Sequence, residues 1–147
     1  MRMASYVKAA SIDGALAAAK AAGGPALYFA GGTDILVKAR ENEFYKDHHV
    51  IDIFGLPELC GVTDAGDRLM IGSMTTHTQI VENELVRQHA NILSLACATV
   101  GSLQIRNHAV IGGNIANASP AADTLPALAV LDAKVEVRRA DETLLLP

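Results

Sequence analysis

Two glycine pairs are the residues of this sequence whose types and spacing best suit a chemical task. Residues 30–36 read AGGTDIL and residues 111–117 read IGGNIAN, so a small polar residue directly follows each pair. Glycine has no Cβ, so its backbone amide can approach a phosphate closely, and a following helix start adds partial positive charge. Thr33 could donate to a phosphate oxygen from its hydroxyl and Asn114 from its side-chain amide. Each pair taken alone is more often only a tight turn, but the two together favour a dinucleotide pyrophosphate site.

An aspartate downstream of the second pair could complete such a site. Asp123 could accept a hydrogen bond from a ribose hydroxyl, as an acidic residue does in other dinucleotide-binding folds. A carboxylate at the start of a helix explains the same residue equally well.

Signals for other kinds of chemistry are missing from the sequence. It contains no GxxxxGK phosphate loop, no GxGxxG motif and no GxSxG nucleophile motif. The five histidines show no HxxxH or HxH spacing, and we expect most of them in loops or at the surface. Cys60 and Cys97 are expected to be buried free thiols in a reducing cytoplasm. We therefore expect no catalytic residue and no metal ligand in the chain, and a cofactor that carries the chemistry.

Composition narrows the class of protein further. The length of 147 residues predicts a single domain with a substantial core, and the net charge of −4 without a basic cluster argues against nucleic-acid binding. The apolar runs are too short for a membrane span, and the first residues do not form a secretory signal, so we expect a cytoplasmic protein. An apolar strand directly before Pro147 indicates a piece of a longer protein or a split subunit.

Local patterns predict the elements that position these residues. Ser11 can cap the first helix, the glycine at 23 can end it, and Thr33 or Asp34 can begin the second helix. Strands and helices alternate early and hairpins follow, so the fold class is α+β, or mixed α/β. The expected elements are a helix over 12–22, a buried strand over 26–30, a helix over 33–40, a strand over 49–54, a hairpin of 58–63 with 68–73, helices over 76–89, 90–101 and 120–131, and a hairpin of 134–139 with 143–147.

Several longer strings resemble one known family. FAGGTDILVKAR, LMIGSMTTH and AVIGGNIANASPAADTLPALAVLDAKVEV are similar to the FAD-binding (medium) subunit of the molybdenum hydroxylases, which include the xanthine dehydrogenases and carbon monoxide dehydrogenase. The resemblance runs from about Tyr6 to Pro147 in one register. It covers the front half to two thirds of such a subunit.

The resemblance implies a particular fold. It is the FAD-binding fold of the p-cresol methylhydroxylase and vanillyl-alcohol oxidase type, with two small subdomains. Residues 1–147 would be the N-terminal portion of the FAD-binding domain, with the boundary between the subdomains near residues 50–58. The separate C-terminal domain of the family is absent, so the fold is truncated.

The resemblance also implies a function, that of a flavoprotein subunit in a heteromeric oxidoreductase complex. The FAD-carrying subunit takes electrons from the [2Fe-2S] clusters of an iron–sulfur partner subunit and passes them to NAD or another acceptor. A molybdopterin subunit hydroxylates the substrate. An alternative is a non-enzymatic nucleotide-binding or scaffold module that has lost redox function. A covalently attached flavin would need a histidine or cysteine nearby, and the sequence does not place His77 or His108 there.

The family pattern assigns cofactor contacts to fourteen positions. Val110 departs from that pattern, because the family usually has Thr or Ser there and valine supplies no hydroxyl. The FAD-binding residues implied by the resemblance are Phe29, Ala30, Gly31, Gly32, Thr33, Asp34, Ile35, Val100, Val110, Ile111, Gly112, Gly113, Asn114 and Asp123.

Overall fold

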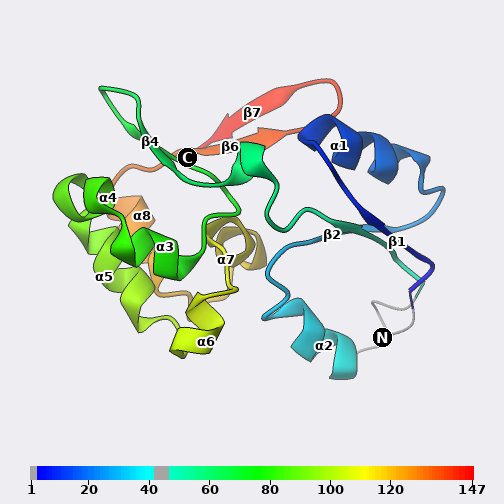
Figure 1. Ribbon diagram of the computed structural model, residues 1–147, viewed down its shortest axis with the longest axis horizontal. Coiled ribbons are helices and arrows are strands. Elements are labelled where there is room, and N and C mark those ends of the chain that lie inside the picture. The colour runs from blue at the N-terminus through cyan, green and yellow to red at the C-terminus, as the bar shows by residue number, and fades with distance from the viewer. Residues whose placement is uncertain (1–2, 42–46) are drawn as a thin grey trace.

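A three-stranded parallel sheet forms the N-terminal part of the molecule, in a computed structural model that describes residues 3–41 and 47–147 (Figure 1). The strands are β1 (Ser5–Lys8), β2 (Ala26–Phe29) and β3 (His49–Asp52), in the order β1-β3-β2. Helix α1 (Ile12–Ala21) connects β1 to β2, and helix α2 (Ile35–Glu41) follows β2. The parallel register brings the carboxyl ends of the strands together, with Lys8 and Phe29 both opposite Asp52.

Predicted local signals explain the first helix. The Ser11 side chain accepts a hydrogen bond from Gly14 N–H at 3.0 Å, and Gly23 follows the helix at a φ of 63°. The expected strand over 26–30 forms as β2, but the expectation that it is buried is wrong. Its residues alternate between exposed and half-buried, because the central strand β3 takes the buried position.

The C-terminal part is built from short helices and two hairpins. Figure 1 shows the helices gathered at one end of the molecule, opposite the parallel sheet. The elements are β4 (Val62–Asp64), β5 (Leu69–Ile71), α3 (His77–Glu82), α4 (Glu84–His89), α5 (Asn91–Thr99), α6 (Leu103–Arg106), α7 (Ile111–Asn117), α8 (Thr124–Val130), β6 (Val135–Arg138) and β7 (Thr143–Leu146). Strands β4 and β5 pair antiparallel, as do β6 and β7, which confirms both predicted hairpins.

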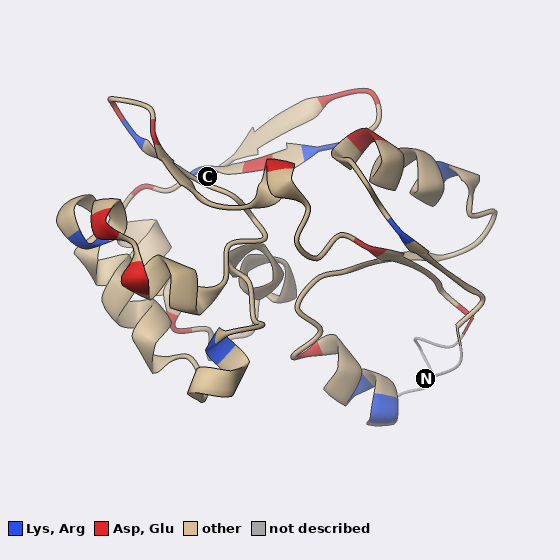
Figure 2. Ribbon diagram, in the orientation of Figure 1, with Lys and Arg blue, Asp and Glu red and all other residues tan. Residues whose placement is uncertain are grey.

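Charged contacts join the two parts. Arg138 on β6 forms a 2.7 Å ion pair with Asp13 on α1, and Glu58 accepts a hydrogen bond from Ile12 N–H at 2.9 Å. Asp34 directly precedes helix α2, and Lys38 and Arg40 lie in its last turn, where Figure 2 shows blue segments. Elsewhere charges of both signs are scattered along the chain.

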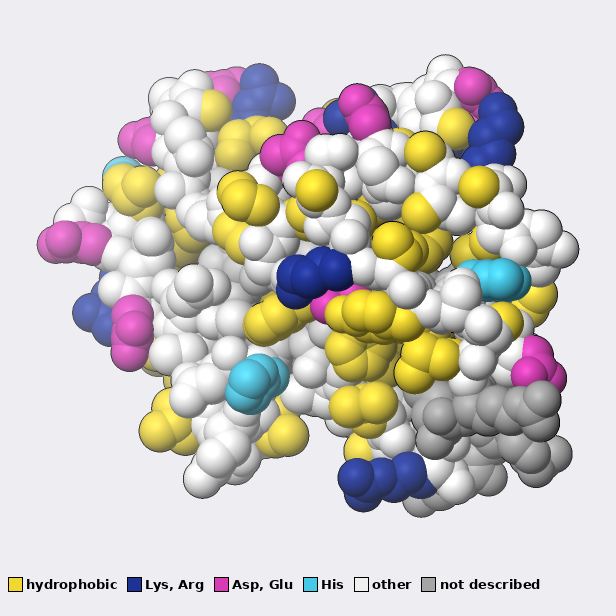
Figure 3. All heavy atoms as spheres, turned by 45° about the vertical axis from the view of Figure 1, so that its right-hand side comes forward, with side chains coloured by type: hydrophobic (Ala, Val, Ile, Leu, Met, Phe, Trp, Pro, Cys, Tyr) yellow, Lys and Arg dark blue, Asp and Glu magenta, His cyan; other side chains and the backbone are white. Residues whose placement is uncertain are grey.

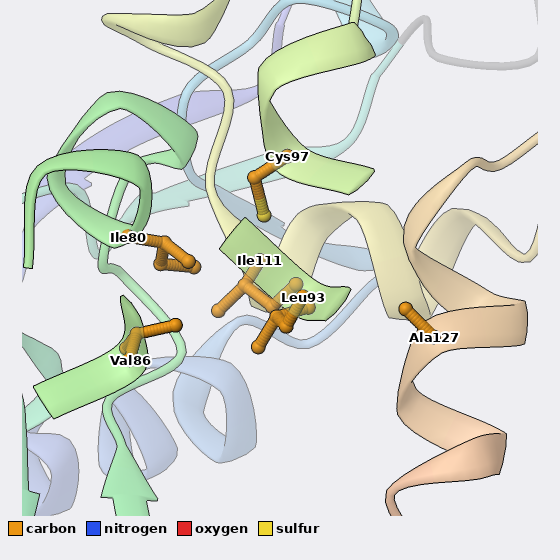
Figure 4. Close-up of a cluster of buried hydrophobic side chains, with 6 residues drawn as sticks. All are labelled: Ile80, Val86, Leu93, Cys97, Ile111 and Ala127. Carbon is orange, nitrogen blue, oxygen red and sulfur yellow. The ribbon is translucent and has the colours of Figure 1, made fainter. Parts of the chain in front are cut away.

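Hydrophobic side chains are distributed between a core and the surface. On the face in Figure 3 they gather around the centre of the molecule, beside the parallel sheet and the helices. The buried core lies among the helices and is drawn in Figure 4. Its members are Ile80, Val86, Leu93, Cys97, Ile111 and Ala127. Since these residues come from α3, α4, α5, α7 and α8, the core fixes the helix that carries the second glycine pair.

Several elements of the structure differ from the sequence prediction. The helix expected over 76–89 is two helices, because Asn83 ends α3 and its side chain caps α4 through Val86 N–H. The helix expected from residue 120 begins at Thr124. The second glycine pair lies in the first turn of α7 rather than in a loop. Strand β1 and helix α6 had no sequence prediction.

Candidate functional site

The first glycine segment packs against the turn that directly precedes the second. Gly31 follows β2 and packs so closely against the turn before α7 that a Cβ on it would lie 1.8 Å from the carbonyl oxygen of His108. A second contact joins helix α2 to helix α7. Lys38 of α2 donates to Asn117 Oδ1 of α7 at 2.6 Å and forms a 2.7 Å ion pair with Asp34. The structure therefore brings together the residues predicted from positions 30–36 and 110–114.

The four glycines have different physical roles. Gly32 has a φ of 73°, which non-glycine residues rarely adopt, as a tight turn after β2 requires. A Cβ on Gly112 would lie 2.6 Å from Ser73 Cβ and 2.8 Å from Ser73 O. Around a Cβ on Gly113, Val110 Cγ2 at 3.3 Å is the only close atom among the described residues. Packing therefore requires glycine at 31 and 112, whereas a Cβ on Gly113 would require only a small shift of the Val110 side chain.

The start of α7 leaves one backbone donor free. Ile111 N–H donates to Thr75 O at 3.0 Å, and Gly112 N–H donates to Ser73 O at 2.9 Å. Gly113 N–H has no acceptor among residues 3–41 and 47–147. Val110 is the N-cap residue and makes no side-chain capping bond, since valine has no acceptor. The unpaired N–H is available to an anionic ligand.

Asn114 supplies a second free donor beside the first. Its Oδ1 accepts a hydrogen bond from the Thr124 hydroxyl, and within the described part of the chain its Nδ2 has no acceptor. Thr124 is the first residue of α8, directly after the N-cap residue Asp123. Asp123 is exposed, and its carboxylate makes no capping bond. The bond between Asn114 and Thr124 thus places Asp123 next to the second glycine segment.

The first glycine segment adds donors from the start of α2. In the described residues, neither the Thr33 hydroxyl nor the backbone N–H groups of Thr33 and Asp34 have a protein acceptor. The ring of Phe29 packs against Gly32, while Ala30 is half-buried and Ile35 begins α2. The Asp34 carboxylate is engaged by Lys38, so the donors of this segment lie in its backbone and in Thr33.

An open groove of about 270 Å³ runs beside this segment, between α2 and α6. It is lined by Gly31, Gly32, Thr33, Leu36, Val37, Arg40, Gln104, Ile105 and His108. Sequence reasoning missed the last six of these, because tertiary packing brings α6 against α2 and no local pattern marks that contact. Val100 does not line the groove. It lies at the turn between α5 and α6, where its carbonyl accepts from Arg106 at 3.2 Å.

One expectation about titratable residues is wrong, since Cys60 is exposed rather than buried. His77 is fully buried and is thus an exception among the histidines, most of which were expected in loops or at the surface. His77 Nδ1 lies 3.4 Å from Cys97 Sγ in the core. Burial, together with the charge of Arg106, lowers the pKa of His77, and burial raises the pKa of Cys97 to about 12. His77 is therefore a buried core residue whose lowered pKa favours the neutral imidazole.

Asp52, the last residue of β3, is a buried carboxylate at the carboxyl end of the parallel sheet. Asp52 is 8% exposed and accepts from the Tyr6 hydroxyl at 2.6 Å and from Phe54 N–H at 2.9 Å, with Lys8 Nζ at 3.3 Å. Burial alone would raise the pKa of this carboxyl group, but the three partners favour its charged form and the pKa lies below its usual value.

No group of three His, Cys, Asp or Glu side chains that could hold a metal occurs in the described residues.

Comparison with known proteins identifies the family of this chain. Residues 2–147 match the family model described as the FAD binding domain in molybdopterin dehydrogenase. The chain belongs to this FAD-binding family. None of the helices in the part of the chain that the structure describes is long and apolar enough to cross a membrane.

Members of the family with known names cover most of the chain. A xanthine dehydrogenase FAD-binding subunit from Escherichia coli O157:H7 is 42% identical over 110 residues, which is 74% of this chain and 37% of that protein. A nicotinate dehydrogenase FAD-subunit from Eubacterium barkeri is 39% identical over 111 residues, 76% of this chain and 37% of that protein. The chain thus spans little more than a third of the length of these relatives.

A solved structure of the family has the same fold. It is a carbon monoxide dehydrogenase from Hydrogenophaga pseudoflava that lacks the Mo-pyranopterin moiety of its cofactor. The TM-score is 0.91 at 29% sequence identity, and the match covers all of this chain and 50% of that one. The mixed α/β fold predicted from the sequence is confirmed as that of the family's FAD-binding chain, of which it forms half.

The free donors of this FAD-binding family member fit the family's cofactor. A diphosphate offers only acceptor oxygens and carries negative charge, so it needs N–H and O–H donors at close range. Gly113 N–H, Asn114 Nδ2 and the Thr33 hydroxyl are such donors, and each lacks an acceptor in the described structure.

Proposed function

We propose that this chain forms the diphosphate-binding part of an FAD-carrying electron-transfer subunit in a multisubunit molybdenum hydroxylase. The observation that carries the proposal is a pair of free donors on successive residues of α7, Gly113 N–H and Asn114 Nδ2, in a helix whose preceding turn packs against Gly31. The two expected subdomains, divided near residues 50–58, are then the parallel-sheet part and the helical part, with the site between them.

Each group at the site has a distinct role in this proposal. Gly113 N–H, Asn114 Nδ2 and Thr33 hold the diphosphate, and the Asp123 carboxylate accepts from a ribose hydroxyl. Leu36, Val37 and Ile105 line the groove with apolar surface and keep water from a ligand there. The other contacts implied by the family pattern remain proposals of the same kind: Phe29, Ala30, Gly31, Gly32, Asp34, Ile35, Val100, Val110, Ile111 and Gly112.

The rest of the proposal concerns electron flow. Bound FAD supplies the ability to take up and release electrons. The names of the relatives support a dehydrogenase complex, in which an iron–sulfur subunit delivers electrons from [2Fe-2S] clusters and a molybdopterin subunit hydroxylates the substrate. The acceptor is NAD or another oxidant. A scaffold that has lost redox function is the second candidate, and the missing hydroxyl at Val110 is the observation that favours it.

Flavin titration of the complete gene product containing these residues tests the proposal. Apoprotein is titrated with FAD by fluorescence, and Gly113→Val is compared with Gly24→Val as a matched control. The added side chain at Gly113 meets only Val110 but covers the free donors, so we expect FAD affinity to fall at least tenfold while the melting temperature of the apoprotein is kept. A Cβ at Gly24 meets only the His49 ring at 3.4 Å or beyond, so that variant should bind FAD normally.

Two results would count against the proposal. A wild-type protein that binds no FAD would favour the scaffold alternative. A Gly113→Val variant with wild-type FAD affinity would show that the start of α7 is not the diphosphate site.

A further inference from the structure

We infer that Thr124 is a positioning residue, whose hydroxyl holds the Asn114 side chain with its Nδ2 donor turned toward the cofactor. This inference rests on the proposed function, since it takes Asn114 as a diphosphate ligand. It adds a residue outside the fourteen positions that the family pattern implies.

The first step of the argument is the hydrogen bond itself. Thr124 is fully buried at the first position of α8, and its hydroxyl donates to Asn114 Oδ1. No other acceptor of the Thr124 hydroxyl is found among the described residues. If the NH₂ end of the Asn114 amide faced Thr124, the buried Thr124 hydroxyl would have no acceptor for its proton, which costs free energy. The orientation with Asn114 Oδ1 facing Thr124 is therefore favoured.

The second step concerns the other end of the amide. An amide carries its acceptor and its donors on opposite ends, so fixing Oδ1 at Thr124 turns Nδ2 away from it. Asn114 is half-buried, and Nδ2 lies on the residue directly after Gly113, whose N–H is also unpaired. The Thr124 bond therefore decides that this position offers a donor to an anion, and not a carbonyl oxygen that would repel it.

The third step concerns the apoprotein. Without the Thr124 hydroxyl, both orientations of the amide become available, and one of them presents oxygen to the diphosphate. Binding must then select the productive orientation, which lowers the apparent affinity about twofold where the two are equally populated, and further where the unproductive orientation is preferred. Asp123 precedes Thr124 directly, so the same bond also fixes the start of α8 beside α7.

Variants of Thr124 and Asn114 in the complete gene product test the inference by FAD titration. Thr124→Val keeps the shape and removes the hydroxyl, so we expect FAD binding about two- to tenfold weaker, the range of one neutral hydrogen bond. Thr124→Ser keeps the hydroxyl and should retain wild-type affinity. In an Asn114→Ala background, Thr124→Val should have no further effect, because the amide that it orients is gone.

A second variant keeps the test valid if Thr124→Val does not fold. Asn114→Asp retains an acceptor for the Thr124 hydroxyl but replaces Nδ2 by a charged oxygen. We expect a larger loss of FAD affinity than in Asn114→Ala, with the melting temperature of the apoprotein maintained. A loss no larger than that of Asn114→Ala would show that Nδ2 does not face the diphosphate, and would overturn the inference.

The remaining outcomes separate the inference from the proposed function. If Asn114→Ala binds FAD as the wild type does, Asn114 is not a ligand and the proposed site fails together with the inference. If Asn114→Ala weakens binding but a folded Thr124→Val does not, the inference alone is wrong. It is also wrong if Thr124→Val weakens binding equally in both backgrounds, since the effect then does not pass through the amide.

Discussion

Replacing Val110 by threonine should stabilise the apoprotein, and the start of α7 gives the reason. Val110 is the N-cap residue at φ −113° and ψ 150°, the extended conformation from which a threonine hydroxyl caps a helix. Its Cγ2 lies 3.3 Å from the position of a Cβ on Gly113, so the side chain is directed toward the residue whose N–H is unpaired. Val110→Thr places an acceptor there with almost no change in volume.

The expected magnitude follows from the capping bond. A Thr cap in place of a residue without an acceptor contributes about 1 kcal/mol to the free energy of unfolding. In a domain of 150–250 residues this raises the melting temperature by about 2–4 °C. In a dry apolar environment the same change would instead destabilise the protein, because the hydroxyl would be buried without a partner. The sign of the stability change therefore distinguishes the two environments.

The assay is thermal unfolding of the apoprotein, followed by FAD titration. Val110 is only 3% exposed, so truncation has a packing cost of its own, which a matched pair of variants removes. Val110→Ser and Val110→Ala differ essentially by one hydroxyl, and we expect the serine variant to melt at the higher temperature. The hydroxyl proton can donate to a phosphate oxygen, so Val110→Thr should also bind FAD several-fold more tightly.

Two results would refute this reasoning. A serine variant no more stable than the alanine variant would mean that a hydroxyl at position 110 cannot reach Gly113 N–H. A threonine variant that is more stable but binds FAD more weakly would mean that the cap competes with the cofactor for that donor.

Two further predictions concern the fold around the site. Gly31→Ala should destabilise the protein by about 1–3 kcal/mol in chemical denaturation, because its Cβ would meet the backbone of His108, whereas Gly24→Ala should cost much less; equal effects would disprove the close contact. Asp52 has a lowered pKa, so its contribution to stability is complete above the unfolded pKa and is lost as the pH falls toward the lower folded value. Asp52→Asn should therefore lower the free energy of unfolding at neutral pH and make it depend less on pH below about pH 4. If the free energy of unfolding of this variant falls with acid as steeply as that of the wild type, Asp52 and its hydrogen bond from Tyr6 are not the cause of the acid dependence.

Elements governed by local chemistry were predictable from the sequence. The Ser11 cap and the turn between β4 and β5 depend on neighbours within a few residues, and they form as predicted. Asn83 shows the limit of such reasoning. Within a polar stretch that predicts a continuous helix, its extended backbone ends α3 and its side chain caps α4, so one helix becomes two.

The candidate site shows which roles a sequence pattern leaves out. The pattern of two glycine pairs assigned both pairs to ligand approach. The structure assigns Gly31 and Gly112 to contacts with other backbone segments, at His108 and Ser73. Such contacts join residues far apart in the sequence, and one sequence contains no local signal for them. The buried hydroxyl of Thr124 went unnoticed for the same reason.

The contact between Gly31 and His108 also sets an order of events during synthesis. The parallel sheet uses strands only from residues 5–52, so it can pair as soon as that stretch has left the ribosome. The glycine segment after β2 packs on backbone near residue 108, about half the chain later, and contacts of such large sequence separation close late. A nascent chain can therefore form its sheet well before the proposed cofactor site is complete. In the proposed function, FAD can bind only after both glycine segments have been translated.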